Sequence, residues 1–304
     1  MLNFTSRTRF SDHIDLFDEV RRNCEFFTVG KIPTKAPAKI VPISAPKYLS
    51  ELRRYPDDIV GIICSPEVAA QCPDHLGCAV SSQPLQAAYM LHKKLAKLEG
   101  YFWTSFKSII SPTAQIHSSA YVAPYNVVIA DDVVIQPNAS VMERTSLGKG
   151  TIVGPNSTIG ADAYEIVNAN GTPELITQAG GVSVGEGVVF LTSVTIARSS
   201  FPVMTQIGDF CSFDNQVHVA HDCMLGKNVK MTACSMLSGR VELGDNAYIG
   251  PNATISNGVT IGRNARISLG SVVASDIPDN AHVSGNFAMD HKTFLRAFRN
   301  LRSA

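Results

Sequence analysis

Three common features are absent from this sequence of 304 residues. It has no apolar run long enough to span a bilayer, so we expect no transmembrane segment. It has no net charge, because 26 Lys and Arg residues balance 26 Asp and Glu residues, and this argues against a nucleic-acid-binding surface. Its N-terminal segment lacks the apolar core of a secretory signal, so we expect a cytoplasmic protein.

Cysteines are few, and none is arranged in a Cys-x-x-Cys pair. The chain has seven, an odd number, scattered along the sequence. This pattern does not indicate a disulfide framework. We therefore expect free, buried thiols, as is typical of a reducing compartment.

The feature that dominates the sequence is an apolar residue at every sixth position. An amphipathic helix has a period of about 3.6 residues and a strand a period of about two, so neither element explains it. A fixed period over a long stretch indicates stacked, near-identical turns of chain. The most regular run consists of Ile207, Phe213, Val219, Leu225, Met231, Leu237, Leu243, Ile249, Ile255, Ile261, Ile267 and Val273.

The same period begins earlier in the chain and is interrupted twice. It runs from residue 129 to 159, with weaker repeats from residue 110, and it breaks at 165–181 and 198–206. We interpret each unit as one short strand and a turn, with the apolar residue pointing inward. Three such units close one triangular coil. Stacked coils then form three parallel sheets, which are stabilised mainly by their neighbours.

The segments on either side of the repeat differ from it. An apolar stretch at 59–64 is typical of a buried strand, and the amphipathic pattern at 83–98 predicts a helix. After Val273 the chain leaves the repeat, and 292–302 predicts another short helix. The predicted domains are a small α/β domain (1–108), a β-helix (109–285) and a C-terminal helix (286–304).

A histidine in the most regular part of the repeat is the candidate for chemistry. His221 is predicted to face outward, at the surface, because neighbouring apolar residues take the inward positions. A neutral imidazole on a rigid scaffold can accept a proton near neutral pH. Gly239 follows three units of the repeat later, one coil along on the same face, where its N–H could stabilise an oxyanion.

A metal site is not expected from the histidines. A zinc-dependent carbonic anhydrase on this fold needs three histidine ligands. Only His218 and His221 are close, and no third histidine falls on the adjacent coils. His218 has no glycine one coil along, because position 236 is Met. We expect neither a metal nor a resident cofactor.

The repeat resembles the left-handed parallel β-helix of the hexapeptide-repeat acyltransferases. This resemblance implies a mainly β fold, a left-handed coil and a homotrimer whose groove lies between neighbouring subunits. His-Val-Ala-His-Asp-Cys, at 218–223, resembles the active-site turn of lipid A acyltransferases and related sugar-nucleotide N-acyltransferases. The resemblance makes His221 the general base, Gly239 the oxyanion donor and Asp222 the residue that orients the turn or the ring.

The order of the parts resembles the family of UDP-3-O-(3-hydroxyacyl)glucosamine N-acyltransferases. The segment 45–48 resembles its uridine-binding segment, although Pro42 and Ala45 replace an aromatic residue and an asparagine of that family. Gly258 lies near the place of the family's second active-site histidine. The substrate contacts that the resemblance implies are Tyr48, Tyr164, Asn215, His218 and Asn257.

The function that these features predict is acyl transfer from a thioester to the amine of a nucleotide-linked amino sugar. The acyl donor is an acyl carrier protein or acyl-CoA, and its arm would lie along residues 239–275. The N-terminal domain would hold the nucleotide. An O-acyltransferase with the same base and a non-catalytic binding module are the two alternatives, and the sugar, the nucleotide and the donor are left open.

Overall fold

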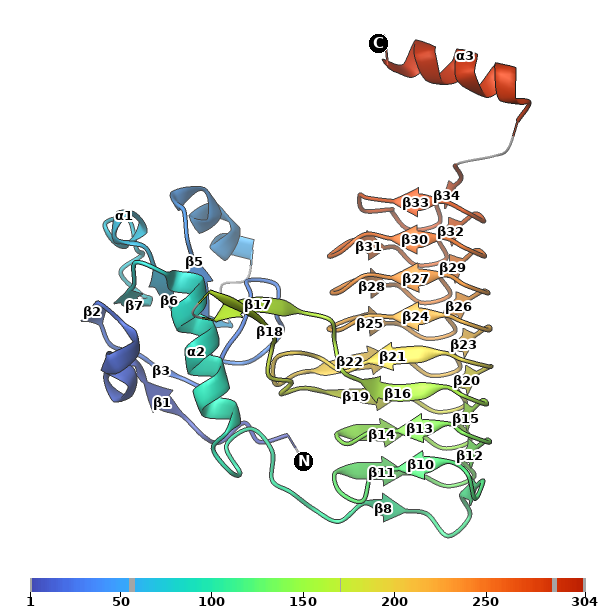
Figure 1. The fold of residues 1–304 in the computed structure, drawn as a ribbon, viewed down its shortest axis with the longest axis horizontal. Coiled ribbons are helices and arrows are strands. Elements are labelled where there is room, and N and C mark those ends of the chain that lie inside the picture. The colour runs from blue at the N-terminus through green and yellow to red at the C-terminus, as the bar shows by residue number, and fades with distance from the viewer. Residues whose placement is uncertain (1, 55–57, 170, 286–288, 303–304) are drawn as a thin grey trace.

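An N-terminal α/β domain lies beside a long stack of β-coils, and a single helix follows the stack (Figure 1). The computed structural model describes residues 2–54, 58–169, 171–285 and 289–302. The C-terminal helix α3 spans His291–Arg302. Residues 286–288 and 303–304 of the predicted C-terminal segment lie outside the described residues.

The N-terminal domain is built on a five-stranded sheet. The strand order is β2-β7-β6-β5-β4, and only β2 runs antiparallel to its neighbour. The predicted apolar strand at 59–64 is the central strand, and it is almost completely buried. The strands are β2 (Glu19–Arg22), β4 (Thr28–Val29), β5 (Lys39–Ile43), β6 (Ile59–Cys64) and β7 (Gly77–Val80).

Helices cover this sheet. The predicted helix at 83–98 is α2 (Pro84–Ala96), whose apolar face packs against β4, β5 and β6. Burial of that face, including Leu91 and Leu95, stabilises the domain, because apolar area is removed from water. The remaining elements are β1 (Thr8–Arg9), η1 (Phe10–Leu16), β3 (Glu25–Phe26), η2 (Pro46–Arg54) and α1 (Pro66–Ala69).

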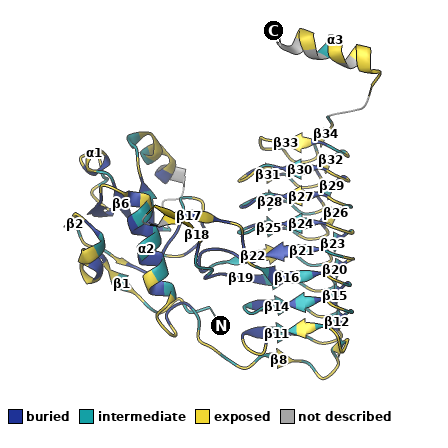
Figure 2. Ribbon diagram, in the orientation of Figure 1, coloured by how far each residue is buried: buried dark blue, intermediate teal, exposed yellow. Residues whose placement is uncertain are grey.

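The six-residue period forms the parallel β-helix that the sequence predicts. Its three sheets contain eight, eight and nine strands. In the regular part, each strand pairs with the strand one coil further along the chain, as His218 pairs with Met236. Buried residues line the inside of the coils from residue 127 to residue 273, whereas the strands of the first coil are exposed or only partly buried (Figure 2).

Each coil contributes one strand to each sheet. The first sheet contains β10 (Tyr121–Val122), β13 (Ser140–Val141), β16 (Thr158–Ala161), β21 (Thr195–Ala197), β24 (His218–Val219), β27 (Met236–Leu237), β30 (Thr254–Ile255) and β33 (Val272–Val273). The second contains β8 (Ile109–Ile110), β11 (Val127–Ile129), β14 (Thr145–Leu147), β19 (Gly181–Val184), β22 (Met204–Ile207), β25 (Met224–Leu225), β28 (Glu242–Leu243) and β31 (Thr260–Ile261). The third contains β9 (Gln115–Ile116), β12 (Val134–Ile135), β15 (Ile152–Val153), β20 (Val189–Phe190), β23 (Ser212–Phe213), β26 (Lys230–Met231), β29 (Tyr248–Ile249), β32 (Arg266–Ile267) and β34 (His282–Val283).

The turns between strands use a left-handed backbone conformation. Non-glycine residues recur there with φ between 54° and 63°. Many are asparagine, which tolerates this region better than other residues because its short polar side chain bonds locally. Asp222 and Arg240 occupy such positions, with φ of 59° and 62°. The turn geometry therefore fixes the direction of their side chains.

The first interruption of the period is a hairpin that reaches the N-terminal domain. It consists of β17 (Ile166–Ala169) and β18 (Thr172–Leu175), which are antiparallel. Strand β16 pairs across this insertion with β21, so that Thr158 lies opposite Thr195. The hairpin packs on α2, and the carbonyl O of Thr177 lies 2.8 Å from Nε2 of His92. The insertion thus ties the two parts together.

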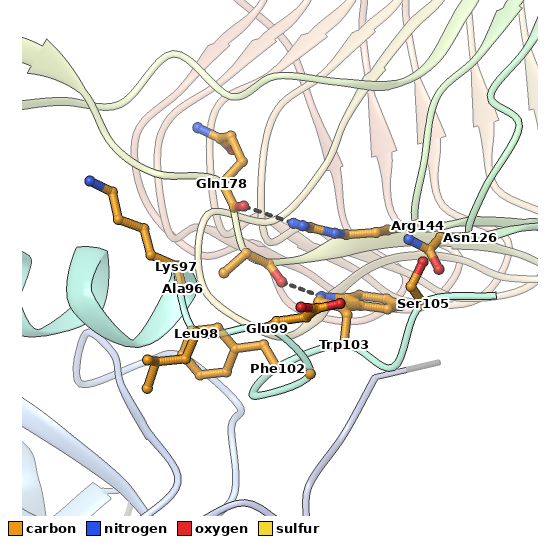
Figure 3. A pocket seen from close by; sticks show the side chains of 12 residues that line it. Ala96, Lys97, Leu98, Glu99, Phe102, Trp103, Ser105, Asn126, Arg144 and Gln178 are labelled. Atoms are coloured by element: carbon orange, nitrogen blue, oxygen red, sulfur yellow. Dashed lines mark hydrogen bonds between the residues drawn. The ribbon is translucent and has the colours of Figure 1, made fainter.

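A second junction lies where the chain passes from α2 into the coils (Figure 3). The indole N–H of Trp103 donates to the carbonyl of Ala179 at 2.6 Å, and the Arg144 guanidinium lies 5.5 Å from the Trp103 ring centroid. Nη1 of Arg144 donates to the carbonyl of Gln178 at 2.8 Å. These contacts hold the interdomain linker against the insertion.

The sequence predicted no transmembrane segment and free cysteines. No helix among the described residues is long and apolar enough to cross a membrane. All seven cysteines are free, as expected, but only four are buried: Cys24 and Cys72 are half-buried, and Cys234 is exposed.

The coil core predicts a stability difference between two nearby phenylalanines. Phe213 is buried, and its ring stacks on that of Phe190 with the ring centroids 4.9 Å apart. Phe210, in contrast, is 60% exposed. We expect Phe213→Ala to lower the free energy of unfolding by about 3–5 kcal/mol through loss of burial and a residual cavity. Phe210→Ala is the control and should change it by less than about 1 kcal/mol. Urea unfolding followed by circular dichroism measures both, and equal losses would contradict the core assignment.

Candidate active site

The predicted catalytic turn follows strand β24, on the outside of the coil. The backbone N–H of Arg240 donates to the carbonyl of His221 at 2.8 Å. The N–H of Gly258 donates to the carbonyl of Gly239 at 3.0 Å. These bonds stack the turns of successive coils directly on one another. A separation of one full coil along the chain therefore brings His221 and Gly239 together.

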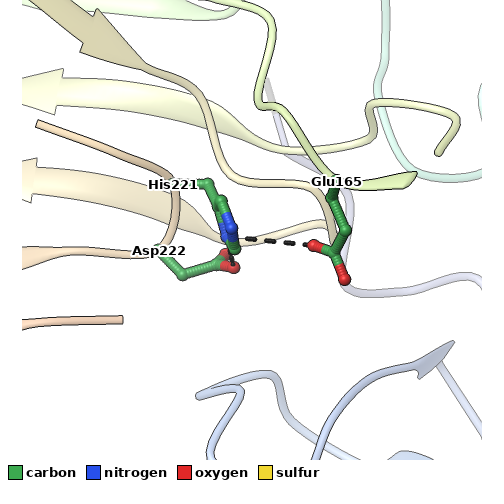
Figure 4. Close-up of side chains that lie close together, drawn as sticks. All are labelled: Glu165, His221 and Asp222. Carbon is green, nitrogen blue, oxygen red and sulfur yellow. Dashed lines mark hydrogen bonds and ion pairs between the residues drawn. The ribbon is translucent and has the colours of Figure 1, made fainter. Parts of the chain in front are cut away.

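A carboxylate fixes the orientation of the His221 ring. Nδ1 of His221 lies 2.7 Å from Oδ2 of Asp222 (Figure 4). The backbone N–H of Asp222 donates to Oγ1 of Thr205 at 3.1 Å, which anchors the turn on the preceding coil. An ionised carboxylate only accepts, so Nδ1 carries the hydrogen. This leaves Nε2 as the ring nitrogen that can accept a proton.

Gly239 lies directly against that free nitrogen. A Cβ at this position would be 2.6 Å from Nε2 of His221, so only glycine leaves room for the ring. Among the hydrogen bonds of the described residues, none uses the N–H of Gly239. An unpaired backbone N–H beside a basic nitrogen is the arrangement that an oxyanion needs.

Two residues that the sequence analysis did not identify complete the site. Oε2 of Glu165 lies 3.9 Å from Nδ1 of His221 (Figure 4), and Glu165 forms an ion pair with Lys31. Glu165 immediately precedes the inserted hairpin, and Lys31 belongs to the loop between β4 and β5. Neither segment follows the six-residue period, so the spacing rule could not find them.

The burial of His221 differs from the expectation. It projects outward from its coil, but only 11% of its side chain is exposed, so the prediction of a surface-facing histidine is wrong. The Glu165 segment covers the ring from one side. Enclosure of this kind strengthens electrostatic interactions, because water is partly excluded.

Neighbouring residues favour the ionised form of the Glu165 carboxyl group. Burial raises the pKa of its carboxyl group, but the Lys31 ammonium and, to a smaller extent, His221 lower it by more. The net pKa of Glu165 is below its ordinary value. Burial, followed by the nearby Glu165 charge, raises the pKa of the Tyr89 hydroxyl on α2. The site therefore contains an anionic Glu165 and a neutral Tyr89 at neutral pH.

Of the predicted contacts, His218 lies on strand β24 and Asn215 lies on the turn before that strand. His218 is half-buried on β24, and burial followed by the nearby His221 lowers its pKa. Oδ1 of Asn215 accepts a hydrogen bond from the backbone N–H of Thr192 at 3.0 Å. The Asn215 side chain therefore supports the neighbouring coil, whereas His218 lies beside the base.

The other three predicted contacts are dispersed. Tyr164 is 87% exposed, next to Glu165 in the chain. Asn257 is exposed on the coil that follows Gly239. Tyr48 lies on η2 of the N-terminal domain, where the Lys47 ammonium is 5.0 Å from its ring centroid. The structure does not bring these residues into contact with His221.

The same side chains carry atoms of the kinds that bind metal ions. Among the described residues, Glu165, His221 and Asp222 have ligand atoms within 4.8 Å of one another. A divalent ion there would compete with the ammonium of Lys31, which already neutralises Glu165. The hydrogen bond from His221 to Asp222 also uses the ring nitrogen that faces both carboxylates. The donor set fits an oriented base better than a metal centre.

Comparisons with known proteins identify the family. The bacterial transferase hexapeptide model (six repeats) matches residues 126–161 and 240–275. A UDP-3-O-acylglucosamine N-acyltransferase of Leptospira biflexa is 40% identical over 106 residues, covering 35% of this chain and 30% of that protein. An acyl-[acyl-carrier-protein]--UDP-N-acetylglucosamine O-acyltransferase of Thermodesulfovibrio yellowstonii is 39% identical over 183 residues, covering 59% of this chain and 69% of that protein. The chain belongs to the hexapeptide-repeat acyltransferase family.

The extent of these similarities differs among the relatives. The chain spans about 30% of the length of the first curated relatives that it matches. Among solved structures, a UDP-N-acetylglucosamine acyltransferase from Campylobacter jejuni has a TM-score of 0.49 and 24% identity, covering 64% of this chain and 82% of that one. Membership of the hexapeptide-repeat acyltransferases agrees with the parallel coils observed.

The contact between Gly239 and the imidazole predicts a specific steric effect. We expect Gly239→Ala to displace the His221 ring, because the new Cβ would overlap Nε2. The ring ¹⁵N and ¹³C NMR resonances of His221 should shift. Gly285→Ala is the control, since a Cβ at Gly285 meets nothing within 4 Å. Unchanged His221 resonances in Gly239→Ala would contradict the observed packing.

The Lys31–Glu165 ion pair predicts a pH-dependent stability difference. Glu165 has a lowered pKa, so its contribution is present at neutral pH and is lost as pH falls through that pKa. We expect Lys31→Met to cost about 1–3 kcal/mol of unfolding free energy at pH 7, with a smaller difference below pH ~4. Urea unfolding at both pH values measures it. Lys149→Met, in an exposed pair with Asp132, should cost little at either pH, and an equal loss there would contradict the assignment.

Proposed function

We propose that this protein transfers an acyl group from a thioester to the amine of a nucleotide-linked amino sugar, with His221 as general base. The observation that carries this proposal is the position of Nε2 of His221. That nitrogen lies against the backbone of Gly239, while Asp222 holds the other ring nitrogen. The two catalytic functions that acyl transfer needs, a base and an oxyanion donor, are thus adjacent.

The first step is attack of the sugar amine on the thioester carbonyl. A C–N bond forms, the carbonyl π electrons move to oxygen, and Nε2 of His221 accepts the amine proton. The N–H of Gly239 donates a hydrogen bond to the resulting oxyanion. The N–H need not reorient during the reaction, because it belongs to the backbone of a regular coil. Asp222 keeps the ring oriented and stabilises the imidazolium that forms.

The second step is collapse of the tetrahedral intermediate. The C=O bond re-forms, the C–S bond breaks, and the imidazolium returns its proton to the departing thiolate. The products are an amide and a free thiol, and His221 is again neutral. The thioester itself supplies the activated acyl group, so the reaction needs neither a resident metal nor a cofactor.

The substrates and the assembly are part of the same proposal. The acceptor nucleotide would bind to the N-terminal domain, and the donor arm would lie along residues 239–275, delivered by acyl carrier protein or CoA. The names of two relatives support a UDP-linked sugar. The family resemblance supports a homotrimer. Binding both substrates in one groove accelerates the reaction by proximity.

O-acylation is the second candidate, and one observation favours it. The Thermodesulfovibrio yellowstonii relative, which the match covers over 69% of its length, is named acyl-[acyl-carrier-protein]--UDP-N-acetylglucosamine O-acyltransferase. A hydroxyl nucleophile would use the same base and the same oxyanion donor. Product chemistry separates the candidates, because an ester is cleaved by mild hydroxylamine and an amide is not.

The general-base proposal predicts the effect of removing the imidazole. We expect His221→Ala to lower kcat by about 10²–10⁴-fold, which is the usual contribution of a positioned base. The measurement is acyl transfer from acyl-CoA or acyl carrier protein to UDP- and dTDP-linked amino sugars, with products identified by mass spectrometry. His117→Ala, which removes an exposed histidine of an early coil, is the control. A near wild-type rate in His221→Ala would refute the mechanism.

A further inference from the structure

A pocket lies beside the proposed catalytic turn, between the two domains. One wall is the loop after β4, at 33–35, and the other is the face of the coils that includes Asp222 and Arg240. The pocket has a volume of about 110 Å³. Pockets for drug-sized ligands usually measure about 300–1,000 Å³, so this one accommodates a compact group rather than a whole nucleotide.

The pocket contains a cationic side chain that no described residue pairs with. Arg240 is half-buried, and its Nη1 is completely buried with no hydrogen-bond partner among the described residues. Within that part of the chain, its guanidinium forms no ion pair either. A buried N–H group of a charged side chain is unfavourable without an acceptor, so this arrangement favours binding of an anionic oxygen. Arg240 follows Gly239 directly, so the anion would bind next to the proposed oxyanion donor.

The pocket also contains an acceptor that the described residues leave unsatisfied. Oδ1 of Asp222 is buried and accepts no hydrogen bond from them, although Oδ2 bonds to His221. A matching ligand therefore needs a hydroxyl or amine donor as well as an anionic oxygen. The other carboxylate of the pocket, Glu242, is already paired with the Lys35 ammonium at 2.7 Å.

The loop at 33–35 that forms one wall of the pocket is held by a hydrogen bond of its own and by an ion pair to the coils. Thr34 is buried, and its Oγ1 accepts from the backbone N–H of Lys31 at 3.0 Å. The ion pair of Lys35 with Glu242 then fastens the loop to the coils. The pocket is therefore a built feature of the interdomain contact rather than an open surface.

We propose that this pocket binds the sugar-phosphate end of the acceptor, with Arg240 on a phosphate oxygen and Oδ1 of Asp222 on a sugar hydroxyl or amine. This inference rests on the proposed function, because it names the part of the acceptor that lies next to His221. A hexose phosphate has the required chemistry, an anion beside several donors. Arg240 then positions the sugar so that its nucleophile reaches Nε2.

The experiment measures binding without any acyl donor. The probes are glucosamine 1-phosphate, glucosamine and coenzyme A, titrated into the full-length protein and followed by NMR or calorimetry. We expect Arg240→Gln to weaken glucosamine 1-phosphate binding by about 10–100-fold, as is typical of a lost charge-assisted hydrogen bond. Arg240→Lys should retain part of the affinity. Coenzyme A binding should not change.

A matched control is available on another sheet of the coil. Arg266 is exposed, its guanidinium lies 4.6 Å from the Tyr248 ring centroid, and it does not line the pocket. Arg266→Gln should bind all three probes as the wild type does. Circular dichroism of each variant confirms that the coil is folded.

The outcomes separate this proposal from the proposed reaction. It is overturned if the wild type does not bind glucosamine 1-phosphate, if Arg240→Gln binds it equally well, or if Arg266→Gln loses as much affinity. A loss confined to coenzyme A would assign the phosphate to the donor and would also overturn it. Binding through Arg240 in a protein that transfers no acyl group would support the pocket and refute the reaction.

Discussion

Backbone pairing between successive coils is the constraint on which the rest of the structure depends. Each coil hydrogen-bonds to the next along three sheets, so an error in register at one turn would misplace every later turn. The apolar residues that enforce this register are almost all inaccessible to solvent. As a result, the same register sets which turn residues lie next to one another. His221 and Gly239 are adjacent because the register allows no other neighbour.

The remaining residues of the site come from segments that do not follow the regular pairing of the coils. The insertion between β16 and β21 contributes Glu165, and the N-terminal domain contributes Lys31. A regular coil alone would expose the imidazole on an open surface. The hairpin and the loop instead enclose it and add charges that a repeating sequence cannot supply. Enclosure matters for acyl transfer, because a thioester under attack must be kept from water.

The sequence predicts the structure well where the six-residue period determines it. It does not predict contacts between segments that are far apart in the chain. The six-residue spacing predicted the coil, its three sheets and the contact between His221 and Gly239. The same spacing places Arg240 one coil after Asp222. Glu165 and Lys31 could not be found in this way, because their meeting depends on how two domains pack. The burial of His221 was missed for the same reason.

One loop of the N-terminal domain links the environment of the base to that of the acceptor pocket. Lys31 pairs with Glu165 beside His221, and Lys35 pairs with Glu242 in the pocket. Both lysines belong to the connection between β4 and β5, in which Oγ1 of Thr34 accepts a hydrogen bond from the backbone N–H of Lys31. A movement of this loop would therefore change the charge near the imidazole and the shape of the pocket together. Because the loop joins two strands of the N-terminal sheet, it connects that domain both to Glu165 beside His221 and to Glu242 in the pocket.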